Sequence, residues 1–145
     1  MYNQENKVSR TRLGKEAKMA EKPRVFRLET GGAQPSQSSP IIRQELMTTE
    51  GSRADVAHIA PGVTPWHHHG EYDTYVYAIS GGPSGRIEFG PGGKESIELS
   101  VGEVVYVPKH IIHRDVTTGS EPVLVFTVRV GTGQPVFNVD GPDPG

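Results

Sequence analysis

The residues of this 145-residue chain that could do chemistry are concentrated in one stretch. All six histidines lie between positions 58 and 113, and His67, His68 and His69 are consecutive. Side chains alternate between the two faces of a strand, so His67 and His69 should point one way and His68 the other. Two imidazoles at positions i and i+2 can ligate a single metal ion. His113 is the leading candidate for a third ligand from elsewhere in the fold.

The donor atoms limit which metal such a site can take. The chain has no cysteine, which excludes thiolate ligands, a thiolate nucleophile and disulfide bonds. Imidazole and oxygen donors leave Fe, Mn, Zn, Ni, Co and Cu open. We therefore expect one divalent transition metal per chain. With open coordination positions it could bind O₂ and a chelating substrate, or act as a Lewis acid on a carbonyl or enol.

The elements that must position these histidines are short strands. Glycine and proline make up 30 of 145 residues, about 21 %, which argues against a helical bundle because both weaken helix interiors. Turn residues recur about every 8–12 positions, which is typical of an all-β sandwich or barrel. We expect strands at about Val25–Glu29, Ile41–Met47, Arg53–Ile59, Pro65–His69, Thr74–Ile79, Arg86–Phe89, Ser96–Leu99, Val104–Val107, His113–Thr117 and Val123–Val130.

Two segments resemble the two motifs of the cupin superfamily. The first motif appears as Gly62-VTPW-His67-x-His69-GEYD-Thr74-YVYAIS-Gly81, with four residues after Gly62 where the family usually has five. The second appears as Gly102-EVVYV-Pro108-Lys109-His110-II-His113-RDV-Thr117. The resemblance is to small single-domain cupins of the type-2 conserved barrel. It covers about residues 41–130 and implies a double-stranded β-helix, or jelly-roll, barrel with a metal in its mouth. It also implies a small-molecule ligand or substrate and a homodimer.

The departures from these motifs leave the ligand set open. Thr74 stands where the family usually has its metal-binding glutamate, and a threonine hydroxyl is a weak neutral ligand. Three histidines could suffice, with water or substrate at the open positions, or Asp73 or Glu71 could supply a substitute carboxylate. Asp73 would need a bulge to reach the metal, because neighbouring residues on a strand face opposite ways. His110 replaces a motif glycine, so it could hold an unusual backbone conformation or line the site mouth.

Aromatic residues beside the motif could form the walls of a ligand pocket, since apolar walls with a few polar groups are usual for such sites. The candidates are Trp66, Tyr75 and Tyr77, and the alternative for them is ordinary packing. His68 is expected at the surface and His58 in the core or an interface. We expect four arginines to be mostly solvated: Arg53, Arg86, Arg114 and Arg129.

The resemblance implies a fold and a bound metal, but it does not single out a reaction, because function belongs to the site and not to the fold. One hypothesis is a small metal-dependent enzyme, of dioxygenase or isomerase type, acting on an organic acid, diketone, phenol or sugar-like compound. The alternative is a non-catalytic cupin that binds a metal or small ligand as a sensor, storage or accessory module.

Charge is unevenly distributed along the chain. Residues 1–24 hold seven lysines and arginines against three glutamates, and we interpret them as a basic, disordered leader, with Met19 an alternative start. The barrel is expected over residues 25–139 and a flexible tail over residues 140–145. The overall net charge of −2 does not suggest a nucleic-acid or membrane-surface protein. Without a signal peptide or a transmembrane run, we expect a cytoplasmic protein.

Overall fold

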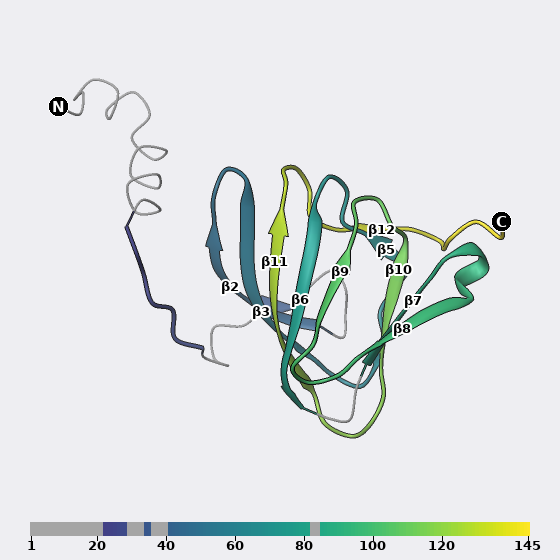
Figure 1. Ribbon diagram of the computed structural model, residues 1–145, viewed down its shortest axis with the longest axis horizontal. Helices are drawn as coiled ribbons and strands as arrows, with labels where there is room; N and C mark the ends of the chain where they lie inside the picture. Colours follow the sequence, from purple (N-terminus) through teal and green to yellow (C-terminus); the bar gives the residue numbers. More distant parts are fainter. Residues whose placement is uncertain (1–21, 29–33, 36–40, 82–84) are drawn as a thin grey trace.

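The computed structural model describes residues 22–28, 34–35, 41–81 and 85–145, and this part of the chain is built almost entirely of strands (Figure 1). A single 3-10 turn, η1 (Pro91–Gly93), joins β7 to β8. Over the described residues, no helix is both long and apolar enough to cross a membrane. The strands are β1 (Gln34–Pro35), β2 (Ile41–Thr48), β3 (Ser52–Ile59), β4 (Gly62–Val63), β5 (His67–His68), β6 (Asp73–Gly81), β7 (Gly85–Phe89), β8 (Glu95–Leu99), β9 (Val104–Val107), β10 (His113–Thr117), β11 (Val123–Val130) and β12 (Phe137–Asn138).

The described strands form two antiparallel sheets that face each other across the core (Figure 1). One sheet has the order β1-β2-β3-β11-β6-β9, and the other has the order β12-β5-β10-β7-β8 with β4 paired to β10. β11 lies between β3 and β6, from which it is distant in sequence, so the sheets are closed by long-range pairing. This all-β, double-sheet arrangement is the fold class that the spacing of turns predicted.

The inner face of the first sheet is recognisable because buried and more exposed residues alternate along its strands. On β11 the buried positions are Val123, Val125, Thr127 and Arg129, and the residues between them are more exposed. At one end of the barrel Ile41, Ala57, Val123 and Val125 pack together. Near the second sheet a further cluster contains Ile87, Val105 and Val107. The inner face therefore changes along β11 from aliphatic residues at its start to Thr127 and Arg129 at its end, where a site can form.

The strand predicted at Val25–Glu29 is wrong over the residues that the structure describes. Residues 22–28 form no strand, and the Val25 side chain is 98 % exposed. Alternating apolar residues stabilise a strand only when a neighbouring strand pairs with them, and here none does. Glu29, and residues 1–21 of the predicted leader, lie outside the described residues.

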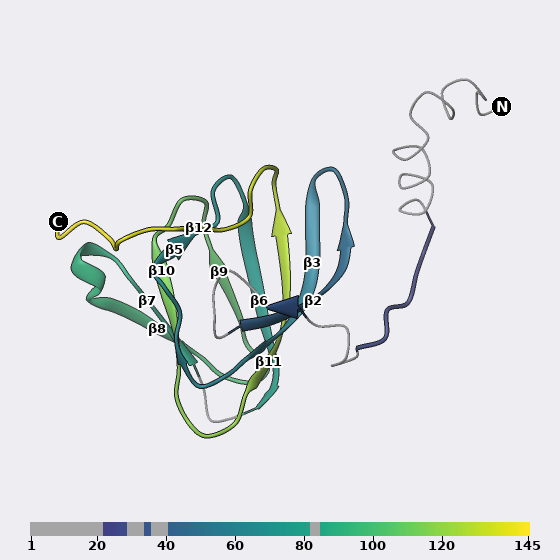
Figure 2. The ribbon, with the colours of Figure 1, turned by 180° about the vertical axis from the view of Figure 1, so that it is seen from behind.

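The C-terminal residues lie along the barrel. Figure 2 shows the chain after β11 crossing the end of the barrel at β12 and running on towards the β7–β8 hairpin. There the carbonyl of Asp143 accepts a hydrogen bond of 2.8 Å from the N–H of Gly92, and Gly141 lies against the Trp66 ring. Two residues of the segment predicted as a flexible tail therefore contact other parts of the chain, and its flexibility stays a prediction.

Candidate metal centre

Short strands bring the three predicted ligands to one place. His67 begins β5 and pairs directly with His113 at the start of β10. Gly70, with a φ of +56°, turns the chain immediately after His69, and a Cβ there would lie 2.7 Å from the Phe137 ring. Glycine tolerates this left-handed conformation at little cost, so the chain can turn directly after the histidine pair. Residues far apart in the sequence are thereby placed side by side.

The three histidines form a buried cluster. One ring nitrogen from each of His67, His69 and His113 lies within 4.8 Å of one from each of the others. The ring centroids are 4.4 Å apart for His67 and His113, 5.0 Å for His69 and His113, and 5.1 Å for His67 and His69. The residues are 1 %, 4 % and 2 % exposed in the order His67, His69, His113. Three imidazoles this close and this dry fit a metal ion better than they fit apolar packing.

Hydrogen bonds set the orientation of every ring in the cluster. Nδ1 lies 2.7 Å from the Pro65 carbonyl in His67, 2.9 Å from the Pro135 carbonyl in His69, and 2.9 Å from the Ile111 carbonyl in His113. A carbonyl can only accept, so Nδ1 carries the proton and donates in each ring. Nε2 is then the unprotonated atom, with a lone pair available to a metal. Metal-bound histidines commonly have their second nitrogen held in this way.

Burial keeps His67 and His69 neutral. It lowers the pKa of His67 to about 4, with the nearby charge of His113 the next largest cause. Burial also lowers the pKa of His69, helped by the positive charge of Arg129. Neutral imidazole is the form that ligates a metal, so at neutral pH no proton has to leave these rings before binding.

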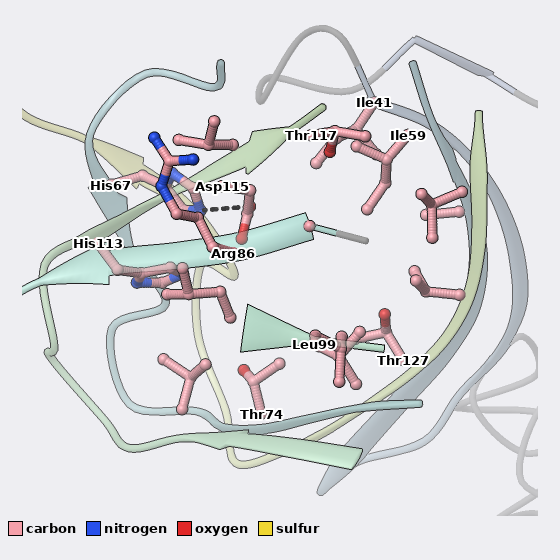
Figure 3. A pocket seen from close by; sticks show the side chains of 18 of the residues that line it. Ile41, Ile59, His67, Thr74, Arg86, Leu99, His113, Asp115, Thr117 and Thr127 are labelled. Atoms are coloured by element: carbon pink, nitrogen blue, oxygen red, sulfur yellow. Dashed lines mark ion pairs between the residues drawn. The ribbon is translucent and has the colours of Figure 1, made fainter. Parts of the chain in front are cut away.

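The cluster opens into a cavity of about 70 Å³ inside the barrel. About 10–15 Å³ is enough for one water, so this space holds several waters or a small chemical group. Figure 3 shows His67 and His113 on one side of the cavity and Ile41, Ile59 and Leu99 around the remainder. The cavity therefore has a polar end at the histidines and an aliphatic end at the opposite side.

Thr74 lies in the cavity wall, as its place in the motif predicted. It is 1 % exposed, and Figure 3 shows its side chain pointing into the cavity. The two candidate substitute carboxylates do not line this cavity. Asp73 accepts hydrogen bonds from the Tyr106 hydroxyl at 2.9 Å and the Lys109 N–H at 3.3 Å. Since strand neighbours face opposite ways, Asp73 points away from the inward-facing Thr74.

Glu71 and His110 form a pair outside the cavity. The Glu71 carboxylate is 2.8 Å from Nε2 of His110, and both side chains are more than half exposed. His110 has a φ of +63°, the one non-glycine residue with positive φ among the described residues. The unusual backbone conformation expected from its replacing a motif glycine is therefore present. Neither residue lines the cavity in this structure.

Asp115 is a cavity residue that the sequence reasoning missed. Its Oδ2 is 3.9 Å from Nε2 of His67 (Figure 3), and its N–H donates to the Thr64 hydroxyl at 2.9 Å. The signal was present, because Asp115 and Thr117 follow His113 at i+2 and i+4 and so share its inward face. Counting by two from His113 would have found both residues.

A buried charged group next to the cluster was also missed. Arg129, predicted to be solvated, is 4 % exposed and lines the cavity. Its Nη1 is 3.0 Å from Oδ2 of Asp55, whose Oδ1 accepts from Nη1 of Arg43 at 2.8 Å. The prediction that Arg129 is solvated is wrong, because Asp55 on the neighbouring strand β3 compensates its buried charge.

The aromatic residues proposed as pocket walls are elsewhere. Tyr75 and Tyr77 are 44 % and 41 % exposed, and Tyr75 stacks on Tyr106 at 5.2 Å on the outside of the sheet. They occupy the outward positions of β6, opposite Thr74. Trp66 is half-buried beneath the guanidinium of Arg114, 4.5 Å from the ring centroid. None of the three residues lines the histidine cavity, so the expectation of pocket walls is wrong for them.

His68 lies on the other side of the chain from its neighbours, as the strand alternation predicted. Its ring stacks on Phe137 at a centroid distance of 5.0 Å, and its Nδ1 accepts a hydrogen bond of 3.0 Å from the N–H of Gly70. His58 pairs in register with Ile42 and Leu124 on the first sheet, outside the histidine cluster.

Comparison with known proteins places the fold. No family model matches the sequence, and no curated protein matches it. The chain is similar to the polyketide cyclase RemF from Streptomyces resistomycificus, with a TM-score of 0.62 and 20 % identity over 80 % of this chain and 86 % of that one. It is similar to an uncharacterized protein with a double-stranded β-helix domain from Klebsiella pneumoniae, with a TM-score of 0.62 and 22 % identity over 81 % and 98 % of the two chains.

A third similar structure is the cupin domain of Cnp3 from Schizosaccharomyces pombe, with a TM-score of 0.59 and 16 % identity over 75 % of this chain and 76 % of that one. TM-scores of 0.59 to 0.62 show a shared fold, and at identities of 16 % to 22 % the similarity is one of fold alone. Together with the two sheets and the three-histidine cluster, they confirm the architecture that the two motifs predicted. The chain has the double-stranded β-helix fold of the cupin superfamily.

Proposed function

We propose that the chain is a metal-dependent cupin enzyme, of dioxygenase or isomerase type, that acts on a small organic molecule. One observation carries the proposal: three buried histidines, each held through Nδ1 by a backbone carbonyl, bring one ring nitrogen apiece within 4.8 Å of the others at a cavity. The ligands would be His67, His69 and His113, holding one divalent transition metal per chain. The similarity in fold to a polyketide cyclase is in keeping with a small-molecule role.

When bound, the metal would supply Lewis-acid or O₂-binding chemistry at the polar end of the cavity. The chain's own groups would orient the substrate and move protons. Asp115 is a carboxylate that lines the cavity, with Oδ2 3.9 Å from Nε2 of His67, and its side chain is 23 % exposed. A partly solvated carboxylate can accept a proton from a substrate and return it, which supports an enzyme over a binding module.

The metal is tested by elemental analysis of protein purified without an affinity tag. We expect close to one transition-metal ion per chain in the wild type and none in the His67→Ala/His69→Ala double variant. His68→Ala is the matched control, because it removes the adjacent imidazole whose ring stacks on Phe137 outside the cluster. Full metal content in the double variant would overturn the proposed site.

Activity is tested by an oxygen-consumption and isomerisation screen over chelating organic acids, diketones, phenols and sugars. Turnover that disappears in Asp115→Asn while the metal content remains would support catalysis with the carboxylate as proton carrier. Full metal occupancy without turnover of any of these classes would count against the enzyme and favour a non-catalytic metal-binding module.

We also propose that the chain forms a homodimer through the outer face of the first sheet. Large apolar side chains on β2, β6, β9 and β11 are between 41 % and 59 % exposed there, and monomers seldom leave a contiguous patch of this kind uncovered. They are Ile42, Tyr75, Tyr77, Val104, Tyr106 and Val130.

Sedimentation equilibrium tests this dimer. Val104→Glu places a charge on β9 in the patch and should give monomers. Val101→Glu, at a similarly exposed valine just outside β9, should leave the dimer intact. A wild-type monomer at micromolar concentration would contradict the proposal.

Cytoplasmic localisation stays a prediction.

A further inference from the structure

Two buried polar atoms have no hydrogen-bond partner among the residues that the structure describes. They are the hydroxyl oxygen of Thr74 and Nε of Arg129, in residues that are 1 % and 4 % exposed. Buried polar groups are nearly always hydrogen-bonded, so an unpaired one requires an explanation such as a bound water, ion or ligand. Finding the two in the same place makes accidental loss of pairing a poor explanation.

The two atoms belong to one wall of the histidine cavity. Thr74 on β6 and Arg129 on β11 are direct cross-strand partners, and both line the cavity together with His67, His69 and His113. Directly opposed residues of an antiparallel pair project their side chains to the same face. The Arg129 charge also acts on His69, whose pKa it helps to lower, which places the guanidinium near the cluster.

The donor types indicate what the ligand is. Arg129 Nε–H can only donate, and the Thr74 hydroxyl can donate as well. A carboxylate only accepts, has two oxygens, and forms its strongest hydrogen bonds with charged donors. Its fit is therefore better than that of an amide or an alcohol, each of which would bring a donor of its own.

The charges around the cavity favour an anion as well. Arg129 and Arg43 share the single carboxylate of Asp55, so these three side chains together carry a net charge of +1. Asp115 is the further acid at the cavity, and it lies beside His67. A divalent ion on the histidines would add positive charge, leaving the cavity short of negative charge.

We propose that the cavity binds a carboxylate group of its ligand through Arg129 Nε–H and the Thr74 hydroxyl, directly beside the three-histidine cluster. The substrate class is therefore a small organic acid, held at its carboxylate end while the rest of the molecule extends towards the aliphatic side of the cavity. This rests on the proposed function, because the molecule is the ligand of the same three-histidine site.

The test uses acetate as the probe and acetamide as its neutral isostere. Both are titrated into untagged full-length protein while the Arg129 Nε–H resonance, assigned by its absence in Arg129→Gln, is followed by NMR. Acetate should shift this resonance saturably, and acetamide should not at the same concentrations. Equal shifts with both compounds, or no shift with acetate, would overturn the carboxylate subsite.

Substitutions of Thr74 isolate the hydroxyl without disturbing a salt bridge. Thr74→Val has the same shape and removes a hydroxyl that has no partner, so folding is expected to survive. Its acetate affinity should fall about tenfold or more, since a hydrogen bond to a charged group is lost. Thr74→Ser keeps the hydroxyl and should bind acetate within about threefold of wild type by the same reasoning. Unchanged affinity in Thr74→Val would refute the role of Thr74.

Metal content measured on the same samples separates this inference from the proposed function. If metal is stoichiometric but acetate leaves Arg129 unmoved, the carboxylate subsite fails and the metal site stands. If acetate shifts the Arg129 resonance in protein that binds no metal, the subsite stands and the metal-dependent function fails. Arg53→Gln, which removes an arginine bonded to the Tyr72 hydroxyl, should leave acetate binding unchanged.

Discussion

Asp55→Asn should destabilise the barrel strongly, because it removes the one carboxylate shared by two arginines next to the cavity. Asp55 is 6 % exposed and contacts Arg43 at 2.8 Å and Arg129 at 3.0 Å. The asparagine keeps the shape but loses the charge, and its amide nitrogen would face a guanidinium donor. The buried Arg129 would then lose the carboxylate that accepts its hydrogen bond, and the more distant charge of Asp115 would be what still offsets its desolvation.

The magnitude follows from burial. Removing one partner of a buried ion pair costs about 3–5 kcal/mol, because an uncompensated charge remains in the interior. Glu88 offers a matched comparison, since it also lies between two arginines, at 2.9 Å from Arg86 and 2.7 Å from Arg114. Those arginine side chains are 40 % and 36 % exposed, and surface pairs contribute about 0–1 kcal/mol.

Urea denaturation of Asp55→Asn and Glu88→Gln measures the two effects side by side. We expect the free energy of unfolding to fall by about 3–5 kcal/mol for Asp55→Asn and by about 0–1 kcal/mol for Glu88→Gln. A similar loss of stability in both variants would refute the argument from burial. The slope of free energy against urea should stay constant, so that the change reports stability and not denatured-state compactness.

Three further outcomes are expected. Burial lowers the pKa of His67 from 6.5 to about 4 and also lowers the pKa of His69, so protonation of either ring favours the unfolded chain. Metal-free protein should therefore lose stability between pH 7.5 and pH 5 in urea melts; the share of His67 is about 2 kcal/mol, and His67→Gln should remove that share while the share of His69 remains. At His110, with a φ of +63°, glycine should be more stable than alanine by about 1 kcal/mol in thermal melts, since only alanine has a strained Cβ. Gly131→Ala would bring a Cβ within 2.3 Å of the Glu71 carbonyl and should cost more than about 1 kcal/mol, whereas Gly51→Ala, with open space around it, should cost less.

The strands and the three histidines could be predicted from the sequence, because strand propensity, turn residues and side-chain alternation act locally. The bounds of β9, β10 and β11 match the predicted ranges. β9 and β11 are rich in β-branched and aromatic residues, which favour strands, and β10 begins at the histidine of the second motif. His67 and His69 were placed by alternation, and His113 by its position in the second motif. Pro65–His69 shortens to the two residues of β5, because only His67 and His68 find partners on β10 and β12.

The buried polar groups could not be predicted from the sequence by such local rules. Arg129 is buried because Asp55 of β3 compensates its charge, and Asp55 stands two residues from Arg53, the residue that pairs with Arg129 in the register. The register between strands this far apart in the sequence cannot be predicted from either strand alone. The wall role proposed for Tyr75 and Tyr77 failed for a simpler reason. Fixing Thr74 as inward already sends both tyrosines outward by strand alternation.

The single tryptophan has a practical consequence. Trp66 is the residue before His67, and its ring lies between the Arg114 guanidinium, Gly93 and Gly141. Its emission therefore reports on a half-buried spot immediately next to the cluster, with no competing indole elsewhere in the chain. A paramagnetic ion such as Cu(II) or Ni(II) loaded at the histidines would quench this fluorescence, giving a label-free titration of the site in the unmodified protein.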